Sequence, residues 1–163
     1  MDAFTADWQA QVSVIATVAY AMVLGGLIGW ERELKRRPAG FRTHMLLAGA
    51  AALLVGLGDL LATHFSGEQY RELVRVDPIR LIEAVVAAVG FLGAGAIFRR
   101  GSTGDRGNVT GLTTAASMLM VAAIGIAAGL RSYVLALGAT LLTLLVLLVL
   151  NWFEGRRRGE DGR

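Results

Sequence analysis

The chain of 163 residues is 55% hydrophobic and only 18% charged, and it contains no cysteine. A soluble domain has about a quarter of its residues charged, whereas the charges here form clusters between long apolar runs, which is typical of an integral membrane protein. The lack of cysteine excludes disulfides and thiolate metal sites. The isoelectric point near 9.9 reflects arginine clusters beside apolar runs, which favours membrane topology, and we expect no nucleic-acid partner.

Five apolar segments are long enough to cross a hydrocarbon core of about 30 Å, which a helix spans in about 20 residues. In chain order they cover residues 11–30, 45–62, 78–98, 111–130 and 133–153. We predict an all-α polytopic membrane protein, a bundle of five transmembrane helices in a single domain, residues 1–163. No Lys or Arg precedes the first segment, which therefore predicts a retained helix and not a signal peptide.

The distribution of Lys and Arg predicts the orientation of the bundle, because short loops rich in these residues stay in the cytoplasm. Twelve of the sixteen lie in residues 31–44, 99–110 and 154–163. We therefore predict that these two loops and the tail are cytoplasmic. The N-terminus is then outside and the C-terminus inside, with the lipid bilayer as the surrounding partner.

The charged segment ERELKRRPAGFRTH follows the first predicted span. Glu31 and Lys35 are spaced for an i,i+4 ion pair, and Thr43 suits the N-cap of the second helix. One interpretation is a polar cluster of Glu31, Arg42 and His44 that contacts a partner or ligand. The other is a solvated loop that caps helices and binds lipid phosphates. No second His or Cys stands at ligand spacing, so this loop predicts no metal site.

Polar residues mark the starts of two later helices. Asp77 and Pro78 suit the N-cap and the first position of the third helix. Residues 66–75 before them are expected to form a short helix on the outer surface. Thr113 and Thr114, at the start of the fourth span, are expected to hydrogen-bond to their own helix or to a neighbouring one.

Glycines recur inside the predicted spans, where small residues allow helix backbones to approach closely. The pairs with GxxxG spacing are Gly25/Gly29 and Gly125/Gly129. They suggest a homo-oligomer, most simply a dimer. In the third span, Gly90, Gly93 and Gly95 allow two structures: close packing against a neighbour, or a break in the helix that exposes backbone carbonyls.

Two acidic residues, Asp59 and Glu83, lie inside the second and third spans. At 1.5 Å per residue, Asp59 is roughly 9 Å and Glu83 about 7.5 Å below the outer boundary. One interpretation is an outward-facing cation or proton site that both carboxyl groups share. In the other, Arg80 neutralises Glu83, and Asp59 ends the second helix after Gly58.

Three segments resemble the MgtC/SapB family of bacterial inner-membrane proteins, and the resemblance covers residues 20–140. They are GLIGWERELKRRPAGFRTHMLLAGAAAL, DPIRLIEAVVAAVGFLGAGAIFRRG and GLTTAASMLMVAAIGIAAGL. The family positions that this resemblance implies are Glu31, Arg32, Arg42, Thr43, His44, Asp77, Arg80, Gly90, Gly93, Gly95, Thr113 and Thr114. The chain departs at Thr110, where members commonly carry a basic residue, and at Leu119, where they often carry Trp. We expect a short form with the membrane domain only.

The resemblance implies an inner-membrane location and an association with magnesium limitation, acid adaptation and, in some members, virulence. Two hypotheses follow. The first is a non-enzymatic regulator of ion homeostasis or of another inner-membrane complex. The second is a small transporter or channel for magnesium or another cation or proton. The sequence contains no hydrolase, phosphate-binding or dinucleotide motif. We therefore expect no enzymatic activity and no cofactor, with Mg²⁺ or a proton as the conceivable ligand.

Overall fold

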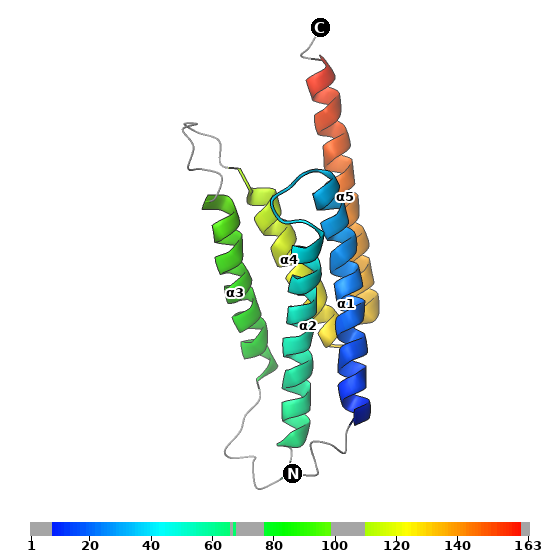
Figure 1. Ribbon diagram of the computed structural model, residues 1–163, viewed down its shortest axis with the longest axis vertical. Helices are drawn as coiled ribbons and strands as arrows, with labels where there is room; N and C mark the ends of the chain where they lie inside the picture. The colour runs from blue at the N-terminus through cyan, green and yellow to red at the C-terminus, as the bar shows by residue number, and fades with distance from the viewer. Residues whose placement is uncertain (1–7, 66, 68–76, 99–109, 161–163) are drawn as a thin grey trace.

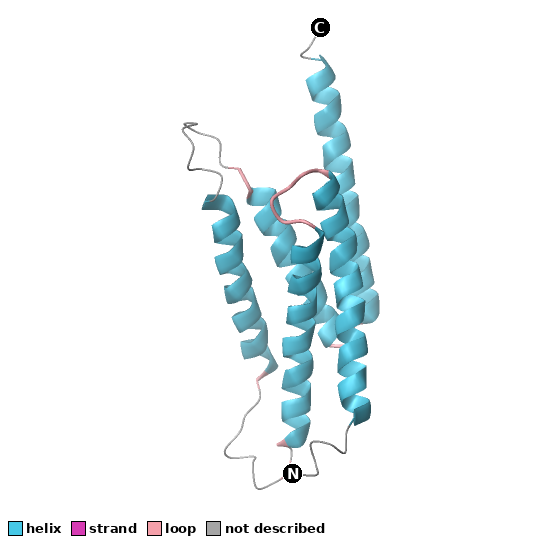
Figure 2. Cartoon of the chain, in the orientation of Figure 1, coloured by secondary structure: helices cyan, strands magenta, loops and turns pink. Residues whose placement is uncertain are grey.

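The structure is a computed structural model that describes residues 8–65, 67, 77–98 and 110–160. These residues form α-helices and no strand (Figures 1 and 2). The helices are α1 (Trp8–Leu34), α2 (Phe41–His64), α3 (Pro78–Phe98), α4 (Leu112–Gly129) and α5 (Tyr133–Glu160). The predicted all-α fold with five long helices is therefore confirmed. The short helix predicted at residues 66–75 lies outside the described residues.

Helices α1 to α4 are long and apolar enough to cross a membrane. The apolar part of α5 within the residues searched, Tyr133–Val149, is shorter than the other four. Both α1 and α2 extend further toward the charged segment than the predicted spans do, so α1 runs through Leu34 and α2 begins at Phe41. The predicted loop of fourteen residues is in fact a six-residue turn between two helix ends, residues 35–40. The orientation of the bundle stays a prediction.

Helix α2 packs against both α1 and α4, which also contact each other, and glycines make the two contacts of α2 close. A Cβ atom added at Gly25 would lie 2.6 Å from the His44 carbonyl oxygen and 2.7 Å from the Ala48 Cβ. From α4, a Cβ at Gly125 would collide with the Ala48 carbonyl oxygen. One at Gly129 would lie 2.7 Å from the Val55 Cβ. These glycine faces pack inside the chain, so they give no support to the predicted homo-oligomer.

Helix α3 is continuous from Pro78 to Phe98, which excludes a helix break at its glycines, the second of the two structures that the sequence allowed. Opening a helix exposes carbonyl groups that hydrocarbon cannot satisfy, and an unbroken helix avoids that cost. Gly93 does pack, because a Cβ added there would lie 3.3 Å from the Cβ of Ala115 on α4. Gly90 and Gly95 face open space. Close packing is therefore confirmed for one of the three glycines.

The helix starts partly match their predictions. The Ile79 N–H donates to Oδ1 of Asp77 at 2.9 Å, which confirms Asp77 as the N-cap of α3. The predicted cap at Thr43 is wrong, because α2 begins two residues earlier and Thr43 is an exposed residue of its first turn. The Glu33 carboxylate caps the start of α2 instead, because it accepts a hydrogen bond from the Phe41 N–H at 2.8 Å. It reaches across the short turn to a free amide of the helix start.

An arginine in the left-handed backbone conformation follows two residues after the end of α1 and of α4, at Arg36 (φ 52°) and Arg131 (φ 60°). After α1, the Arg37 N–H donates to the Arg32 carbonyl oxygen at 3.0 Å. After α4, the Ser132 N–H donates to the Ala127 carbonyl oxygen at 2.9 Å. Such a turn, with one residue in the left-handed conformation, satisfies the last carbonyl groups of a helix. Glycine normally occupies the left-handed position, because a residue with a side chain costs about 1 kcal/mol or more there.

Replacing Arg36 with glycine is expected to raise the free energy of unfolding by about 1 kcal/mol, because it removes this strain from an exposed residue. The melting temperature of the purified protein in detergent measures the effect. Arg37→Gly is the matched control, since Arg37 is exposed and has no positive φ, and it should melt at or below the wild-type temperature. A lower melting temperature for Arg36→Gly than for Arg37→Gly would contradict this account.

Candidate functional site

A pair of opposite charges is buried in the last turn of α1. Only 7% of Glu31 and 1% of Arg32 is exposed. Arg32 Nε donates to Oε2 of Glu31 at 2.6 Å, and Glu31 Oε1 pairs with Lys35 Nζ, which confirms the predicted i,i+4 pair. Lys35 also donates to the Leu147 carbonyl oxygen at 3.4 Å and so joins α1 to α5. One carboxylate therefore holds two cations at a junction of helices.

Arg32 is among the largest wholly buried side chains of the described residues. Its Nη1 has no hydrogen-bond partner there. Burying a guanidinium is costly unless an anion and further acceptors surround it, so the Glu31 carboxylate is the group that makes this burial tolerable. Native proteins keep such an arrangement at few positions, which marks this turn as a candidate functional site.

His44, in the first turn of α2, is fully buried and links two helices. Its Nδ1 lies 2.9 Å from the Gly40 carbonyl oxygen, and since a carbonyl only accepts, the Nδ1–H donates. Its Nε2 lies 3.1 Å from the Ser117 hydroxyl on α4, which also lies 2.8 Å from the Thr114 carbonyl oxygen. In the neutral imidazole, the single hydroxyl proton of Ser117 is shared between these two acceptors.

The structure divides the predicted loop residues into two groups. Glu31, Arg32 and His44 are buried at the adjoining ends of α1 and α2, where a Cβ added at Gly29 would lie 2.9 Å from the His44 Cβ, and we call these three residues the buried cluster. Arg42 and Thr43 are exposed on the same end of the bundle. The interpretation as a solvated loop is therefore wrong for Glu31 and His44, which are buried, whereas the contact of this polar cluster, the exposed Arg42 included, with a partner or ligand stays a prediction.

The start of α4 supplies a residue that the sequence analysis missed. Ser117 is buried and contacts His44, whereas Thr113 is exposed. Thr114 is also buried, at 2% exposure, and its carbonyl accepts the bond from Ser117. The i,i+3 spacing of Thr114 and Ser117 places both on one helix face, and this polar pair in an apolar run was the available signal.

Asp59 and Glu83 do not share a site. Asp59 Oδ2 lies 3.7 Å from Nη2 of Arg131, in the turn between α4 and α5. Glu83 is on an exposed face of α3 and does not line the pocket beside Asp59. Arg80 pairs with Asp77 at 3.9 Å, which contradicts the predicted neutralisation of Glu83 by Arg80. Helix α2 continues through His64, so Asp59 does not end it.

The reason for this error is geometric. Residue counting along a helix gives depth but not the direction in which a side chain points. The face of α3 that packs inward carries Val85 and Val89 instead. Among the described residues, no three His, Asp or Glu side chains are grouped so that they could hold a metal ion.

The region between the two polar ends is apolar and closely packed. Its buried apolar residues include Ala21, Leu24, Ala48, Ala52, Val121 and Ile124. The glycine contacts on both sides of Ala48 bring three backbones together within this region. The described charged side chains thus lie toward the two ends of the bundle, and the buried hydroxyls of Thr140 and Thr143 between them donate to carbonyl oxygens of their own helix.

A sequence model of the MgtC family matches residues 18–156. The chain belongs to the MgtC family. The resemblance seen in the three sequence segments is thereby confirmed. Together with the apolar helices, membership makes this MgtC-family chain a multi-pass membrane protein.

Three relatives show how far the similarity extends. The chain is 32% identical over 95% of its length to Protein SapB of Bacillus subtilis, and 37% identical over 93% to Protein MgtC of Brucella abortus. It is 37% identical over 90% to YhiD of Escherichia coli, which carries the provisional name of magnesium transporter. The chain spans 63%, 60% and 65% of the lengths of these relatives, respectively. No solved structure matches the chain.

Proposed function

We propose that this MgtC-family protein is a non-enzymatic regulator of ion homeostasis that acts by contact with another complex of the bacterial inner membrane. The observation that supports this function best is the placement of its charged groups. Transporters hold their ions near the middle of the membrane, between helices that carry polar side chains or free carbonyls. Here the middle of the bundle, around Ala48, Ala52 and Val121, is closely packed and holds no charged side chain among the described residues.

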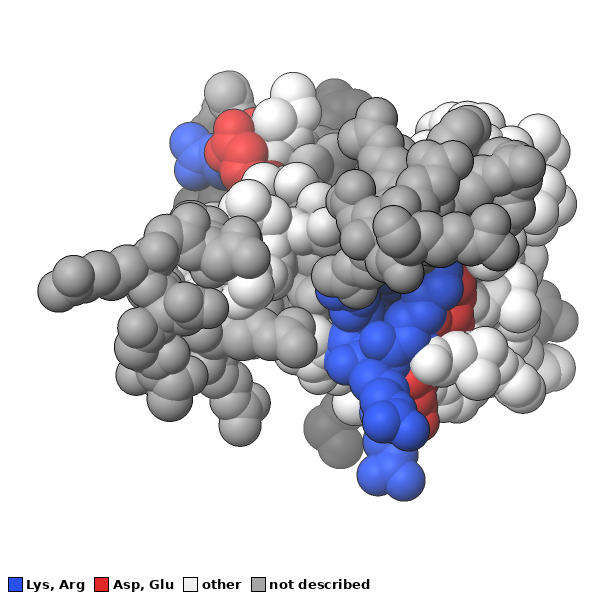
Figure 3. Space-filling model, turned by 90° about the horizontal axis from the view of Figure 1, so that it is seen from above, with Lys and Arg blue, Asp and Glu red and all other residues white. Residues whose placement is uncertain are grey.

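The turn between α1 and α2 offers a surface for such a contact. Figure 3 shows Lys and Arg gathered on this end of the molecule beside acidic side chains. The exposed cations of the turn are Arg36, Arg37 and Arg42. The buried cluster of Glu31, Arg32 and His44 fixes the two helix ends from which they project. A rigid cationic surface suits an acidic partner, because less side-chain and backbone freedom is lost on binding.

Arg42→Ala is expected to abolish function while leaving the amount of protein in the membrane unchanged, because Arg42 is exposed and supports no buried contact among the described residues. The measurement is growth at limiting magnesium of a bacterial strain that lacks its own MgtC-family protein and carries the variant. Arg80→Ala is the matched control, an exposed arginine at the opposite end of the bundle, and it should restore growth fully. Full growth with Arg42→Ala would remove the turn from the proposed contact surface.

A second candidate function is transport of magnesium or another cation. The provisional name of YhiD suggests it, and Asp59 beside an open pocket supplies an accessible carboxylate. A transport cycle would then have to open the middle of the bundle, because the described residues place no charged side chain there and the buried hydroxyls of Thr140 and Thr143 are bonded to their own helix.

A further inference from the structure

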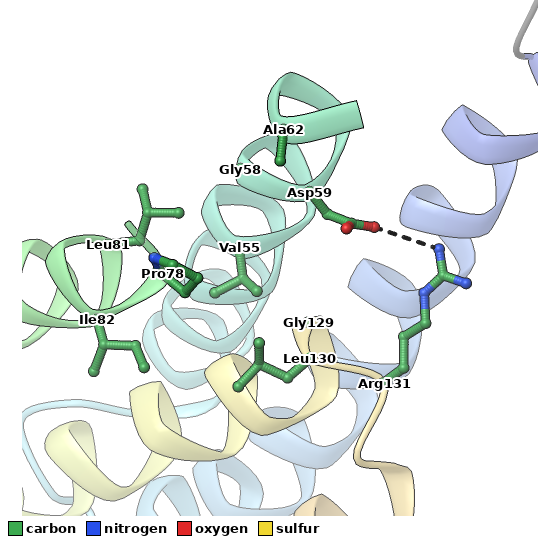
Figure 4. A pocket seen from close by; sticks show the side chains of 10 residues that line it. All are labelled: Val55, Gly58, Asp59, Ala62, Pro78, Leu81, Ile82, Gly129, Leu130 and Arg131. Atoms are coloured by element: carbon green, nitrogen blue, oxygen red, sulfur yellow. Dashed lines mark ion pairs between the residues drawn. The ribbon is translucent and has the colours of Figure 1, made fainter. Parts of the chain in front are cut away.

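A pocket of about 430 Å³ lies at the end of the bundle opposite the buried charges (Figure 4). It is formed by the last turns of α2, the first turns of α3 and the turn that follows α4. Its apolar lining is Val55, Ala62, Pro78, Leu81, Ile82 and Leu130. A volume of this size, with apolar walls and few polar groups, is typical of a site for a small or flexible apolar group.

The pocket has one acidic and one basic side chain, Asp59 and Arg131, and Figure 4 shows them facing each other at its edge. Their closest charged atoms, Oδ2 and Nη2, are 3.7 Å apart, which is longer than a hydrogen bond. Both side chains are more than half exposed, at 62% for Asp59 and 57% for Arg131. Each group therefore retains hydrogen-bonding capacity for a ligand.

The backbone of Arg131 is in a strained conformation. Its φ of 60° is a conformation that favours glycine, yet the chain has an arginine there. The hydrogen bonds of the turn hold it, since the Arg131 N–H donates to the Ala128 carbonyl oxygen at 2.8 Å. Strain kept at one residue beside a pocket points to a role for its side chain in binding.

The position of the two charges along the bundle matches a lipid headgroup. Asp59 is five residues before the end of α2, which is about 7.5 Å along the helix axis, and Arg131 lies in a turn between two helices. The polar edge of the pocket is thus near the membrane surface, and its apolar walls extend toward the hydrocarbon. A ligand that fits has an anion next to a cation, with an acyl chain attached.

We propose that this pocket binds one phospholipid with a phosphoethanolamine headgroup. The phosphate accepts hydrogen bonds from Arg131, the ammonium group donates to Asp59, and part of an acyl chain lies against Leu81 and Ile82. Two carbon atoms separate the phosphate from the ammonium group, so the headgroup spans two neighbouring opposite charges. The trimethylammonium of a choline lipid has no N–H to donate, and a glycerol headgroup has no cation, so both bind less well. This inference does not depend on the proposed regulatory function.

The test is a titration of the delipidated full chain in mild detergent with phosphatidylethanolamine, phosphatidylcholine or phosphatidylglycerol, followed by native mass spectrometry. The wild type should retain the ethanolamine lipid about fivefold better than the other two, as expected for one exposed charged contact. Asp59→Asn should lower its retention to the level of the choline lipid. Arg131→Gln should weaken retention of all three lipids, because each carries a phosphate.

Two controls and one blocking variant separate this site from general lipid adhesion. Glu83→Gln and Arg80→Gln remove exposed charges that do not line the pocket, and both should retain the lipid as the wild type does. Ala62→Phe should fill the pocket and reduce retention with both charges present. Equal wild-type retention of the three lipids would overturn the proposal. So would Asp59→Asn behaving like Glu83→Gln, or free phosphoethanolamine binding as tightly as the lipid.

Discussion

A leucine at Gly125 is expected to prevent the bundle from assembling. A Cβ atom at this position collides with the Ala48 carbonyl oxygen and lies 2.9 Å from the Ala51 Cβ, before the rest of the side chain is added. These atoms belong to the backbone and the alanine side chains of α2, which is also in close contact with Gly25 of α1. No flexible group can move aside, so we expect a loss of more than about 3 kcal/mol.

Size-exclusion chromatography and thermal melting in detergent measure this loss. Gly90→Ala and Gly138→Ala are the controls, because a Cβ at either glycine meets nothing within 4 Å. Alanine favours a helix over glycine by about 1 kcal/mol, so these variants should melt at or above the wild-type temperature. A monodisperse Gly125→Leu protein with unchanged melting would mean that α4 does not contact α2 as described.

The second large effect is expected for Glu31→Gln. This change leaves the buried Arg32 next to a neutral amide, and breaking a buried pair by removing one partner costs about 3 kcal/mol or more. Lys35 adds less to the loss, because 28% of its side chain is exposed and it can turn toward water. The melting temperature in detergent should therefore fall by several degrees or more.

The control for Glu31→Gln is Glu83→Gln, which removes an exposed carboxylate and should change the melting temperature little. The double variant Glu31→Leu/Arg32→Met removes both buried charges and keeps a similar volume. It should melt above Glu31→Gln, because no uncompensated charge is left buried. Equal melting temperatures for Glu31→Gln and Glu83→Gln would show that the pair is solvated.

The features of the fold that could be predicted are those set by neighbouring residues. The lengths of the apolar runs predicted the helices, and Asp77-Pro78 predicted the start of α3. The i,i+4 spacing predicted the ion pair of Glu31 with Lys35. The GxxxG spacing indicated close helix contacts but not the partner. That partner is α2 of the same chain, because α2 carries small residues such as Ala48 where α1 and α4 approach it.

The candidate site was harder to predict, because it depends on contacts between distant residues. His44 could be selected as a polar residue of the loop, but its partner Ser117 is 73 positions away and has no distinctive motif. Asp59 was placed at a plausible depth, yet its neighbour Arg131 is fixed by a backbone reversal after α4. Such pairings depend on how the helices are rotated about their axes, which residue spacing along one helix does not determine.

The central claim is that the protein acts by contact and does not move an ion, and magnesium flux into proteoliposomes tests it most directly. The purified full chain is reconstituted in vesicles loaded with a magnesium-sensitive dye, and fluorescence is followed after Mg²⁺ is added outside. We expect the same signal from these vesicles as from vesicles without protein, because the bundle is apolar and closely packed around Ala48. Mg²⁺ influx that rises with the amount of protein and is lost in Asp59→Asn would contradict the account.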